Sequence, residues 1–219
     1  MPAFIFDMDG TLIDSENVFV HLPLRLMEQE KQTWPPELLE KVGHVSEMEM
    51  GRLLYSHPDV HLSLPWEEYE PFLWCQMKEL YPSSTTRPIP GAKAFLDGLA
   101  RHGIPYCVAT ATPAEYAVPA LAWQKMEGFP LFTPETVGTD KRNPDFYRIV
   151  AEKLNTRIED CIVVEDALYA IRSAKAAGAT VWAVHDPWLF QDQAEIEQFS
   201  DVQIQDFCAI PDHFSYILQ

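Results

Sequence analysis

Short, continuous runs of apolar residues recur along the chain and predict the strands of an α/β fold. An apolar run without alternation is typical of a strand buried on both faces of a sheet. Beyond residue 90, stretches with helical spacing separate the runs, and such alternation indicates a mostly parallel, doubly wound, Rossmann-like sheet. The predicted strands are Ala3 to Phe6, Pro105 to Ala109, Cys161 to Val164, Thr180 to Val184 and Val202 to Ile204.

The segment between the first two predicted strands has a different pattern. Ser15 can cap a helix with apolar residues at helical spacing, and Ser46 opens a capping box ahead of another helical stretch. The segment contains no convincing strand, and the Pro-, Ser- and Thr-rich stretch Pro82 to Pro88 that ends it is typical of a linker. We therefore expect an α/β core domain formed by residues 1–14 and 83–219, and a small helical domain formed by residues 15–82.

Composition and charge limit the possible partners. The chain has 219 residues, of which 47% are hydrophobic, and a formal net charge of −17. A field of this sign repels nucleic acid and anionic membranes, although a metal ion and a few local cations can still hold a small anionic substrate. No apolar run is long enough to cross a membrane. We expect a cytoplasmic protein, a monomer or small homo-oligomer, that binds neither nucleic acid nor membranes.

Polar residues follow three of the predicted strands at the points where the strands end. Because the carboxyl ends of parallel strands meet at one edge of a sheet, we expect these side chains to converge there. Carboxylates suit Mg²⁺, which binds a few carboxylate oxygens and keeps several waters. The residues are Asp7 and Asp9 after the first strand, Thr110 after the second, and Glu165 and Asp166 after the third.

Lys141 lies in a polar loop ahead of a helix and adds a cation that could balance an oxyanion. Together these residues resemble the four motifs of the haloacid dehalogenase-like (HAD) hydrolase superfamily. Asp7 to Thr11, which reads DMDGT, matches the first motif, Thr110 the second, Lys141 the third and the pair Glu165-Asp166 the fourth. The helical segment falls where subfamily I inserts its type 1 (C1) cap domain, and the resemblance, to the β-phosphoglucomutase and sugar-phosphatase branch, covers essentially the whole chain.

The resemblance implies different catalytic roles for Asp7 and Asp9. Asp7 resembles the family's nucleophile, which attacks phosphorus and forms an aspartyl phosphate, so that the displacement is split into two steps. Asp9 resembles the general acid, which protonates the leaving oxygen and then activates water. Proton transfer of this kind typically contributes about 10²- to 10⁴-fold to the rate.

The resemblance also implies a metal site and a phosphate site. The expected ligands of Mg²⁺ are Asp7, the backbone carbonyl of Asp9, Asp166 directly and Glu165 through a water. The metal would reduce the repulsion between carboxylate and phosphate. The expected phosphate ligands are the Thr110 hydroxyl and the backbone N–H of Ala111, with Lys141 balancing the charge.

Taken singly, several of these residues also have an ordinary structural interpretation. Asp166 could be the N-cap of the following helix, Lys141 a solvated surface lysine, and Thr110 a strand-end residue without a ligand. The sequence departs from the family pattern at two places: Arg142 stands where many members have proline, and Ala170 stands where glycine is common. We expect neither departure to abolish activity.

The predicted cap carries the candidates for substrate specificity, His44 and Glu47. In the β-phosphoglucomutase branch a Gly-x-x-x-Arg pattern binds a second phosphate, whereas here the arginine position is Glu47. Phe19 occupies the position of that branch's hinge histidine, and His21 lies two positions on. Both differences favour a monophosphate phosphatase over a mutase.

The leading hypothesis from the sequence is a HAD-family phosphoric monoester hydrolase. It would use Mg²⁺ and an aspartyl-phosphate intermediate to hydrolyse a small phosphorylated metabolite, most plausibly a sugar phosphate. One alternative is a β-phosphoglucomutase-like phosphosugar mutase. A second is a catalytically idle HAD protein with a binding or regulatory role, although no motif residue is missing here.

Overall fold

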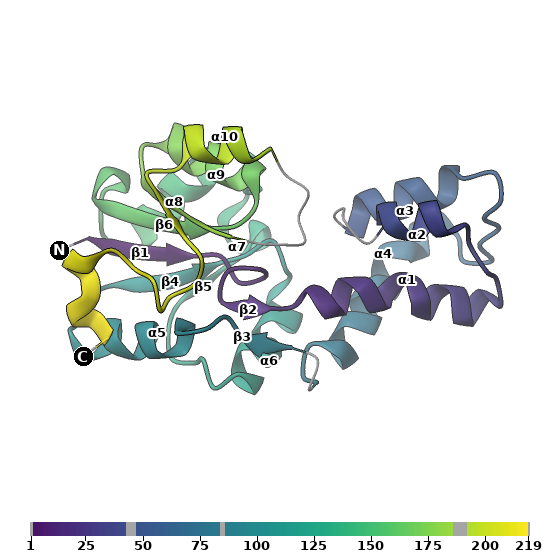
Figure 1. The fold of residues 1–219 in the computed structure, drawn as a ribbon, viewed down its shortest axis with the longest axis horizontal. Helices are drawn as coiled ribbons and strands as arrows, with labels where there is room; N and C mark the ends of the chain where they lie inside the picture. Colours follow the sequence, from purple (N-terminus) through teal and green to yellow (C-terminus); the bar gives the residue numbers. More distant parts are fainter. Residues whose placement is uncertain (1, 43–46, 84–85, 186–191, 219) are drawn as a thin grey trace. The chain divides into compact units, whose positions relative to one another are not determined.

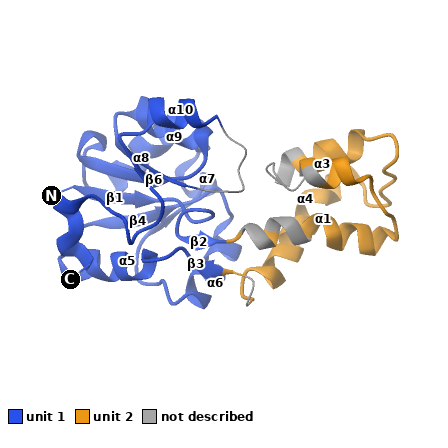
Figure 2. Ribbon diagram, viewed as in Figure 1, with its two compact units in different colours: residues 1–14, 87–187, 191–219 blue, residues 15–86, 188–190 orange. Residues whose placement is uncertain are grey.

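The structure is a computed structural model that describes residues 2–42, 47–83, 86–185 and 192–218. The described chain divides into two compact units, coloured separately in Figure 2. The described residues up to Asp14 and from Arg87 onward form one unit, here called the α/β unit, and Ser15 to Thr86 form the other, the helical unit. No described helix has both the length and the apolar composition that a membrane span requires.

A six-stranded parallel sheet forms the centre of the α/β unit, which confirms the predicted fold class (Figure 1). The order across the sheet is β5-β4-β1-β6-β7-β8, so β1 lies between two strands that come much later in the chain. The strands are β1 (Ala3–Phe6), β4 (Tyr106–Ala109), β5 (Leu131–Phe132), β6 (Cys161–Glu165), β7 (Thr180–Val184) and β8 (Val202–Ile204).

Helices cover both faces of this sheet (Figure 1). A two-stranded antiparallel ladder, in which β2 (Ile13–Asp14) pairs with β3 (Arg87–Pro88), lies where the chain passes between the units. The helices of the α/β unit are α5 (Ala92–Arg101), α6 (Ala114–Trp123), α7 (Pro134–Val137), α8 (Asp145–Lys153), α9 (Leu168–Ala177) and α10 (Gln193–Phe199), with 3-10 helices at Ile158–Asp160 and Asp212–Leu218.

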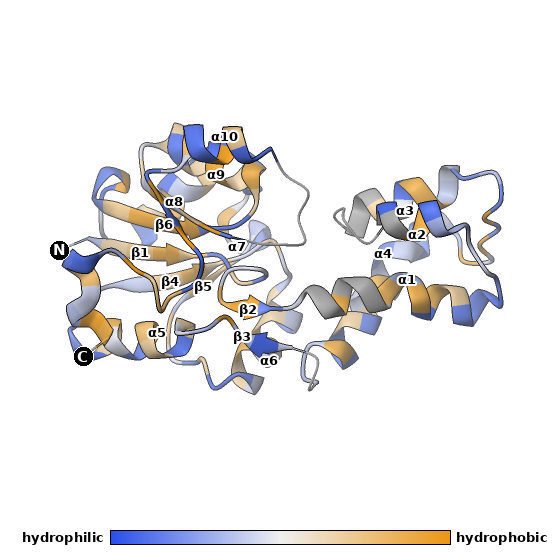
Figure 3. Ribbon diagram, viewed as in Figure 1, coloured by the Kyte–Doolittle hydropathy of each residue, from blue (hydrophilic) through white to orange (hydrophobic). Residues whose placement is uncertain are grey.

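Strand β1 is apolar along its length (Figure 3), and it is buried on both faces, as this continuous apolar sequence predicts. Ala3 and Ile5 face a core cluster that includes residues of α8 and α9. On the opposite face, the ring of Phe4 packs edge-on against Phe95 of α5 and Trp182 of β7, with centroids 5.4 and 5.6 Å apart. This packing anchors the carboxyl end of β1, where the first motif begins.

In its described residues, the helical unit contains the helices α1 (Glu16–Glu30), α2 (Pro36–Val42), α3 (Glu47–Ser56) and α4 (Trp66–Leu80). None of its described residues lies in a strand. The rings of Trp66 and Tyr69 stack with centroids 5.6 Å apart, and Tyr55 meets Tyr69 edge-on. These aromatic residues therefore pack with one another within the unit.

Gly98, on the buried face of α5, allows the C-terminal 3-10 helix to approach the helix backbone. A Cβ at this position would lie 1.8 Å from the carbonyl oxygen of Ile217. The side chains of Arg101 and His102 add polar contacts to the carbonyls of Ile217 and Tyr216, at 3.3 and 3.1 Å. The close approach requires glycine at a position where helix propensity favours alanine.

We expect Gly98→Ala to destabilise the protein, although glycine-to-alanine changes inside helices normally stabilise. The gain in propensity is about 1 kcal/mol, whereas forcing the C-terminal segment away costs about 1–3 kcal/mol by overpacking. Urea unfolding measures the difference. Ala100→Gly, on the exposed face of the same helix, measures the effect of helix propensity on stability without the packing effect. A Gly98→Ala variant more stable than the wild type would contradict the packing of the C-terminal segment.

Candidate functional site

Asp7 directly follows β1 and faces the end of the neighbouring strand β6. Its backbone N–H donates to the carbonyl of Val164 at 2.9 Å, which extends the parallel ladder one residue beyond Phe6. From β1 the chain proceeds to β4 and β5 on one side, and it then returns to β6 on the other. Such a switch in strand order creates a crevice at the carboxyl ends of the strands, where ligands bind in open α/β sheets.

Glu165 and Asp166 lie beside Asp7 at this switch point. One carboxylate oxygen from each of the three residues lies within 4.8 Å of the others, and all three side chains are buried. The Glu165 carboxylate accepts the backbone N–H groups of Asp166 and Ala167, both at 2.9 Å, which fixes its orientation. We call Asp7, Glu165 and Asp166 the carboxylate cluster.

Asp166 contacts the end of the first motif. It lies one residue ahead of Ala167, the N-cap of α9, and its Oδ1 accepts a hydrogen bond from the Thr11 hydroxyl at 3.0 Å. This bond joins the fourth motif to the end of the first. The structure therefore gives the Asp166 carboxylate a place within the cluster.

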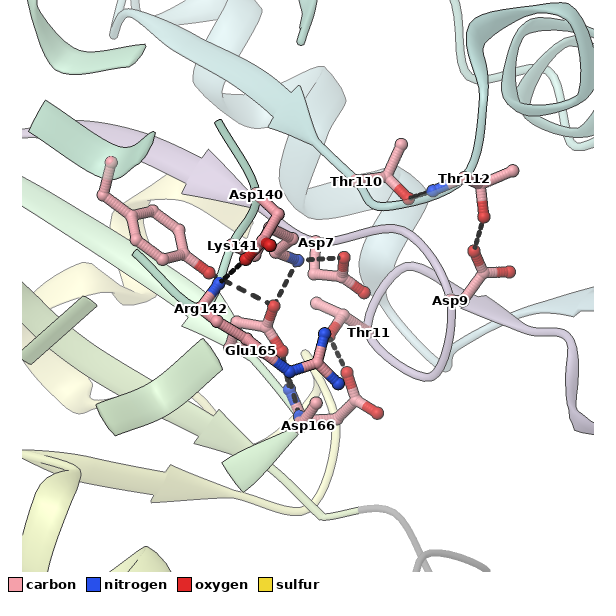
Figure 4. Close-up of polar contacts among 12 residues, drawn as sticks. Asp7, Asp9, Thr11, Thr110, Thr112, Asp140, Lys141, Arg142, Glu165 and Asp166 are labelled. Carbon is pink, nitrogen blue, oxygen red and sulfur yellow. Dashed lines mark hydrogen bonds and ion pairs between the residues drawn. The ribbon is translucent and has the colours of Figure 1, made fainter. Parts of the chain in front are cut away.

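Lys141 is buried, in contrast to the interpretation as a solvated lysine. Its ammonium lies 2.5 Å from Asp7 Oδ1 and makes a second ion pair with Glu165. Figure 4 shows the ammonium between these two carboxylates. In the same loop, Asp140 Oδ1 accepts the backbone N–H of Arg142 at 2.6 Å, so a local turn holds the loop where the sequence departs from the family's usual proline.

The carboxylate cluster holds more negative charge than Lys141 can balance. The pKa of Asp7 is raised to about 8, chiefly by burial and also by the charges of Glu165 and Asp9, against the opposing effect of Lys141. Burial disfavours the charge of Lys141, but Asp7 and Glu165 outweigh burial and raise its pKa well above the ordinary value. Three converging carboxylates with one ammonium fit a hard divalent cation with oxygen ligands, such as Mg²⁺.

A tight turn after β1 separates Asp9 from Asp7. Gly10, with φ of 74°, donates its N–H to the carbonyl of Ile13, and Ile13 donates to the carbonyl of Met8, both at 2.9 Å. A positive φ favours glycine at this position. Asp9 is partly exposed, and its side chain points toward Thr112, outside the carboxylate cluster (Figure 4). The Asp9 carbonyl as a fourth metal ligand stays a prediction.

Thr110 and Ala111 follow β4, on the other side of β1 from β6. Thr110 is buried, and its backbone N–H donates to the carbonyl of Phe132 at 3.0 Å, while Ala111 is exposed. The three strand ends named in the sequence therefore meet at one edge of the sheet. The roles of Thr110 and Ala111 as phosphate ligands stay predictions.

The side chains of the two candidate specificity residues lie outside the described part of the structure. His44 lies outside the described residues, as does the side chain of Glu47. The same holds for the side chains of Phe19 and His21. Their part in choosing between phosphatase and mutase stays a prediction.

The sequence interpretation missed several groups that contact the site. Thr11 and Thr112 donate to Asp166 and Asp9, and the Tyr147 hydroxyl donates to Glu165 Oε1 at 3.4 Å. The guanidinium of Arg142 lies 4.4 Å from the ring centroid of Tyr169. Thr11 was within the recognised first motif, and Thr112 is two residues beyond Thr110, so their positions offered a signal that the sequence interpretation did not use.

Comparison with known proteins identifies relatives along most of the chain. The model of a family described as haloacid dehalogenase-like hydrolase matches residues 4–184. The chain is 28% identical over 198 residues to a “Probable pseudouridine-5′-phosphatase” of Drosophila melanogaster, covering 86% of this chain and 84% of the relative. It is 29% identical over 197 residues to hexitol phosphatase A of Escherichia coli, covering 84% and 83%.

A solved structure resembles the whole fold. The crystal structure described as that of a “putative beta-phosphoglucomutase” from Thermotoga maritima superimposes with a TM-score of 0.77 and 25% identity. The superposition covers 93% of this chain and 94% of the other. The sequence and structural comparisons thus agree with the motif residues found at the switch point.

Proposed function

The chain belongs to the haloacid dehalogenase-like hydrolases, and on that premise we propose that it is a magnesium-dependent phosphatase of a small phosphorylated metabolite, with sugar phosphates as the favoured class. The observation that carries the proposal is the Asp7 carboxylate, held beside Lys141 and two further carboxylates at the switch point of the sheet. The names of the relatives support the same chemistry, since one is called a probable pseudouridine-5′-phosphatase and another hexitol phosphatase A.

The reaction would proceed in two displacements. Asp7 attacks the phosphorus atom and forms an O–P bond as the bond to the leaving oxygen breaks, while Asp9 transfers its proton to that oxygen. Asp9 then takes a proton from a water whose oxygen attacks the phosphorus of the aspartyl phosphate. Inorganic phosphate leaves, and Asp7 returns to its free form.

The remaining site residues stabilise charge during these steps. The Thr110 hydroxyl and the backbone N–H of Ala111, an exposed residue, would donate to phosphoryl oxygens, and Lys141 would balance the charge that develops on them. Asp7, Asp166 and Glu165 would hold Mg²⁺, which when bound offsets the repulsion between the nucleophile and the anionic substrate.

A substrate panel tests this function. The purified wild-type protein is assayed for phosphate release from an aryl phosphate, hexose and hexitol phosphates, glycerol phosphate and pseudouridine 5′-phosphate, with Mg²⁺ and with EDTA. We expect Mg²⁺-dependent hydrolysis, with the highest kcat/KM for a sugar phosphate. Isomerisation of β-glucose 1-phosphate faster than its hydrolysis would favour a mutase instead. Absence of metal-dependent turnover across the panel would favour an idle protein.

A further inference from the structure

Two hydrogen bonds through Thr112 link Asp9 to Thr110. The Thr112 hydroxyl donates to Asp9 Oδ2 at 2.7 Å, and the Thr112 backbone N–H donates to Thr110 Oγ1 at 3.1 Å. Figure 4 shows both hydrogen bonds, with Thr112 lying between Thr110 and Asp9. One residue therefore contacts both the expected proton donor and the expected phosphate ligand.

The backbone holds Thr112 firmly in this place. Strands β1 and β4 are parallel neighbours, so the loop after β1 and the turn after β4 lie at the same edge of the sheet. Thr112 lies on that turn, just before α6, and is only 4% exposed. A β-branched side chain in so buried a position has few rotamers available, so its hydroxyl stays directed at Asp9.

The hydroxyl fixes the orientation of the Asp9 carboxyl group. Oδ2 accepts the hydrogen bond from Thr112, so this contact holds the group that is expected to transfer the proton. At the other end, Thr110 Oγ1 accepts from the Thr112 backbone, so the Thr110 hydroxyl proton can be donated to a ligand. Both effects prepare the groups for the chemistry assigned to them.

We propose that Thr112 is a positioning residue that holds the Asp9 carboxyl group in the orientation in which it exchanges the proton with the leaving oxygen and then with water. This inference rests on the proposed function. In the first displacement the Asp9 proton moves to the leaving oxygen as the P–O bond breaks. In the second displacement Asp9 takes a proton from the attacking water, and Thr112 keeps its own proton throughout.

The simpler interpretation is that Thr112 only closes the turn after β4. The two interpretations differ in how the loss of the hydroxyl should depend on the leaving group. An aryl phosphate releases a phenolate that needs little protonation, whereas an alkyl phosphate such as a sugar phosphate releases an alkoxide that needs a general acid. A defect in the turn alone would slow both substrates equally.

The experiment compares Thr112→Val, which replaces the hydroxyl by a methyl group of similar size, with the wild type on an aryl phosphate and a sugar phosphate. The value of kcat/KM reports the first displacement. We expect it to fall at least about 10-fold for the sugar phosphate and less than about 3-fold for the aryl phosphate, a part of the 10²- to 10⁴-fold available from general acid catalysis. Values of kcat should fall for both substrates, because the second displacement also uses Asp9.

Matched variants make the outcome specific. Thr112→Ser restores the hydroxyl and should recover the wild-type ratio of the two kcat/KM values, and Thr112→Ala should reproduce the valine result if the valine variant folds poorly. Ser173→Ala removes another buried hydroxyl, in α9, and should leave the ratio unchanged. Melting temperatures identify variants that are unfolded.

The control Asp9→Asn separates failure of this inference from failure of the proposed function. If Asp9→Asn lowers kcat/KM selectively for the sugar phosphate but Thr112→Val and Thr112→Ala slow both substrates equally, or not at all, Thr112 does not position the acid. If the wild type hydrolyses neither substrate, or Asp9→Asn shows no such selectivity, the proposed mechanism fails and the inference falls with it.

Discussion

Replacement of Asp7 by Asn is expected to lower kcat for every phosphomonoester at least about 1,000-fold, because an amide cannot replace the carboxylate as nucleophile. Asparagine has nearly the same shape as aspartate, so the loss would reflect chemistry. Phosphate release in the presence of Mg²⁺ measures the effect, with an aryl phosphate and the best sugar phosphate as substrates.

The stability of this variant should change in the opposite direction from its activity. Burial raises the pKa of Asp7 to about 8, from an ordinary value of 3.8, so the ionised carboxylate costs free energy in the metal-free fold. A neutral amide removes that cost, and we expect the Asp7→Asn variant in EDTA to melt at or above the wild-type temperature.

Asp14→Asn provides the matched control for this comparison. It makes the same substitution in the same segment, at a position in β2 that is not part of the carboxylate cluster. Its activity should stay within about 3-fold of wild type, as is usual for changes away from buried networks. Retention of a tenth or more of the wild-type activity in Asp7→Asn would exclude Asp7 as the nucleophile.

Replacement of Lys141 by Met is expected to reduce both stability and activity. Removal of the ammonium leaves Asp7 and Glu165 buried without their cation, and loss of one partner of a buried ion pair typically costs about 3–5 kcal/mol. Urea unfolding in EDTA measures this loss. Mg²⁺ should recover part of it, because a ligand that binds only the folded state stabilises that state.

The activity of this variant should fall at least about 100-fold, since one fixed charge near the phosphoryl oxygens typically contributes this much. Lys175→Met is the matched control, because Lys175 pairs with Asp201 at 2.5 Å but on the surface. An exposed pair contributes about 1 kcal/mol or less, independent of Mg²⁺. Equal destabilisation by the two lysine substitutions would show that the buried ion pairs of Lys141 contribute no more to stability than an exposed pair.

The positions of the three residues of the carboxylate cluster followed from the sequence because the parallel sheet brings strand ends together. Asp7, Glu165 and Asp166 each come directly after an apolar run, so the strand prediction alone located them at one edge. The burial of Lys141 could not be predicted in this way. A polar loop has no periodicity, and only the path of the chain from β5 to α8 directs the lysine inward.

Contacts between segments that are distant in the sequence also could not be predicted from local sequence patterns. Thr112 and Asp9 meet because β4 is the neighbour of β1, and no feature of either segment specifies that strand order. Strand β5 was missed because it has only two residues, Leu131 and Phe132, too few to establish a pattern. Gly98 likewise resembles any helical glycine until the C-terminal segment is placed against it.

The central position of β1 has a consequence for how the protein acquires its fold. The strand is made first, yet its two neighbours, β4 and β6, are residues 106–109 and 161–165. Pairings between segments so far apart close long loops and are slow to form. During synthesis β1 can complete its pairing with β6 only after residue 165 has been made. The helices of residues 15–86 depend on contacts much closer in sequence, so we expect them to form before the sheet and the carboxylate cluster are complete.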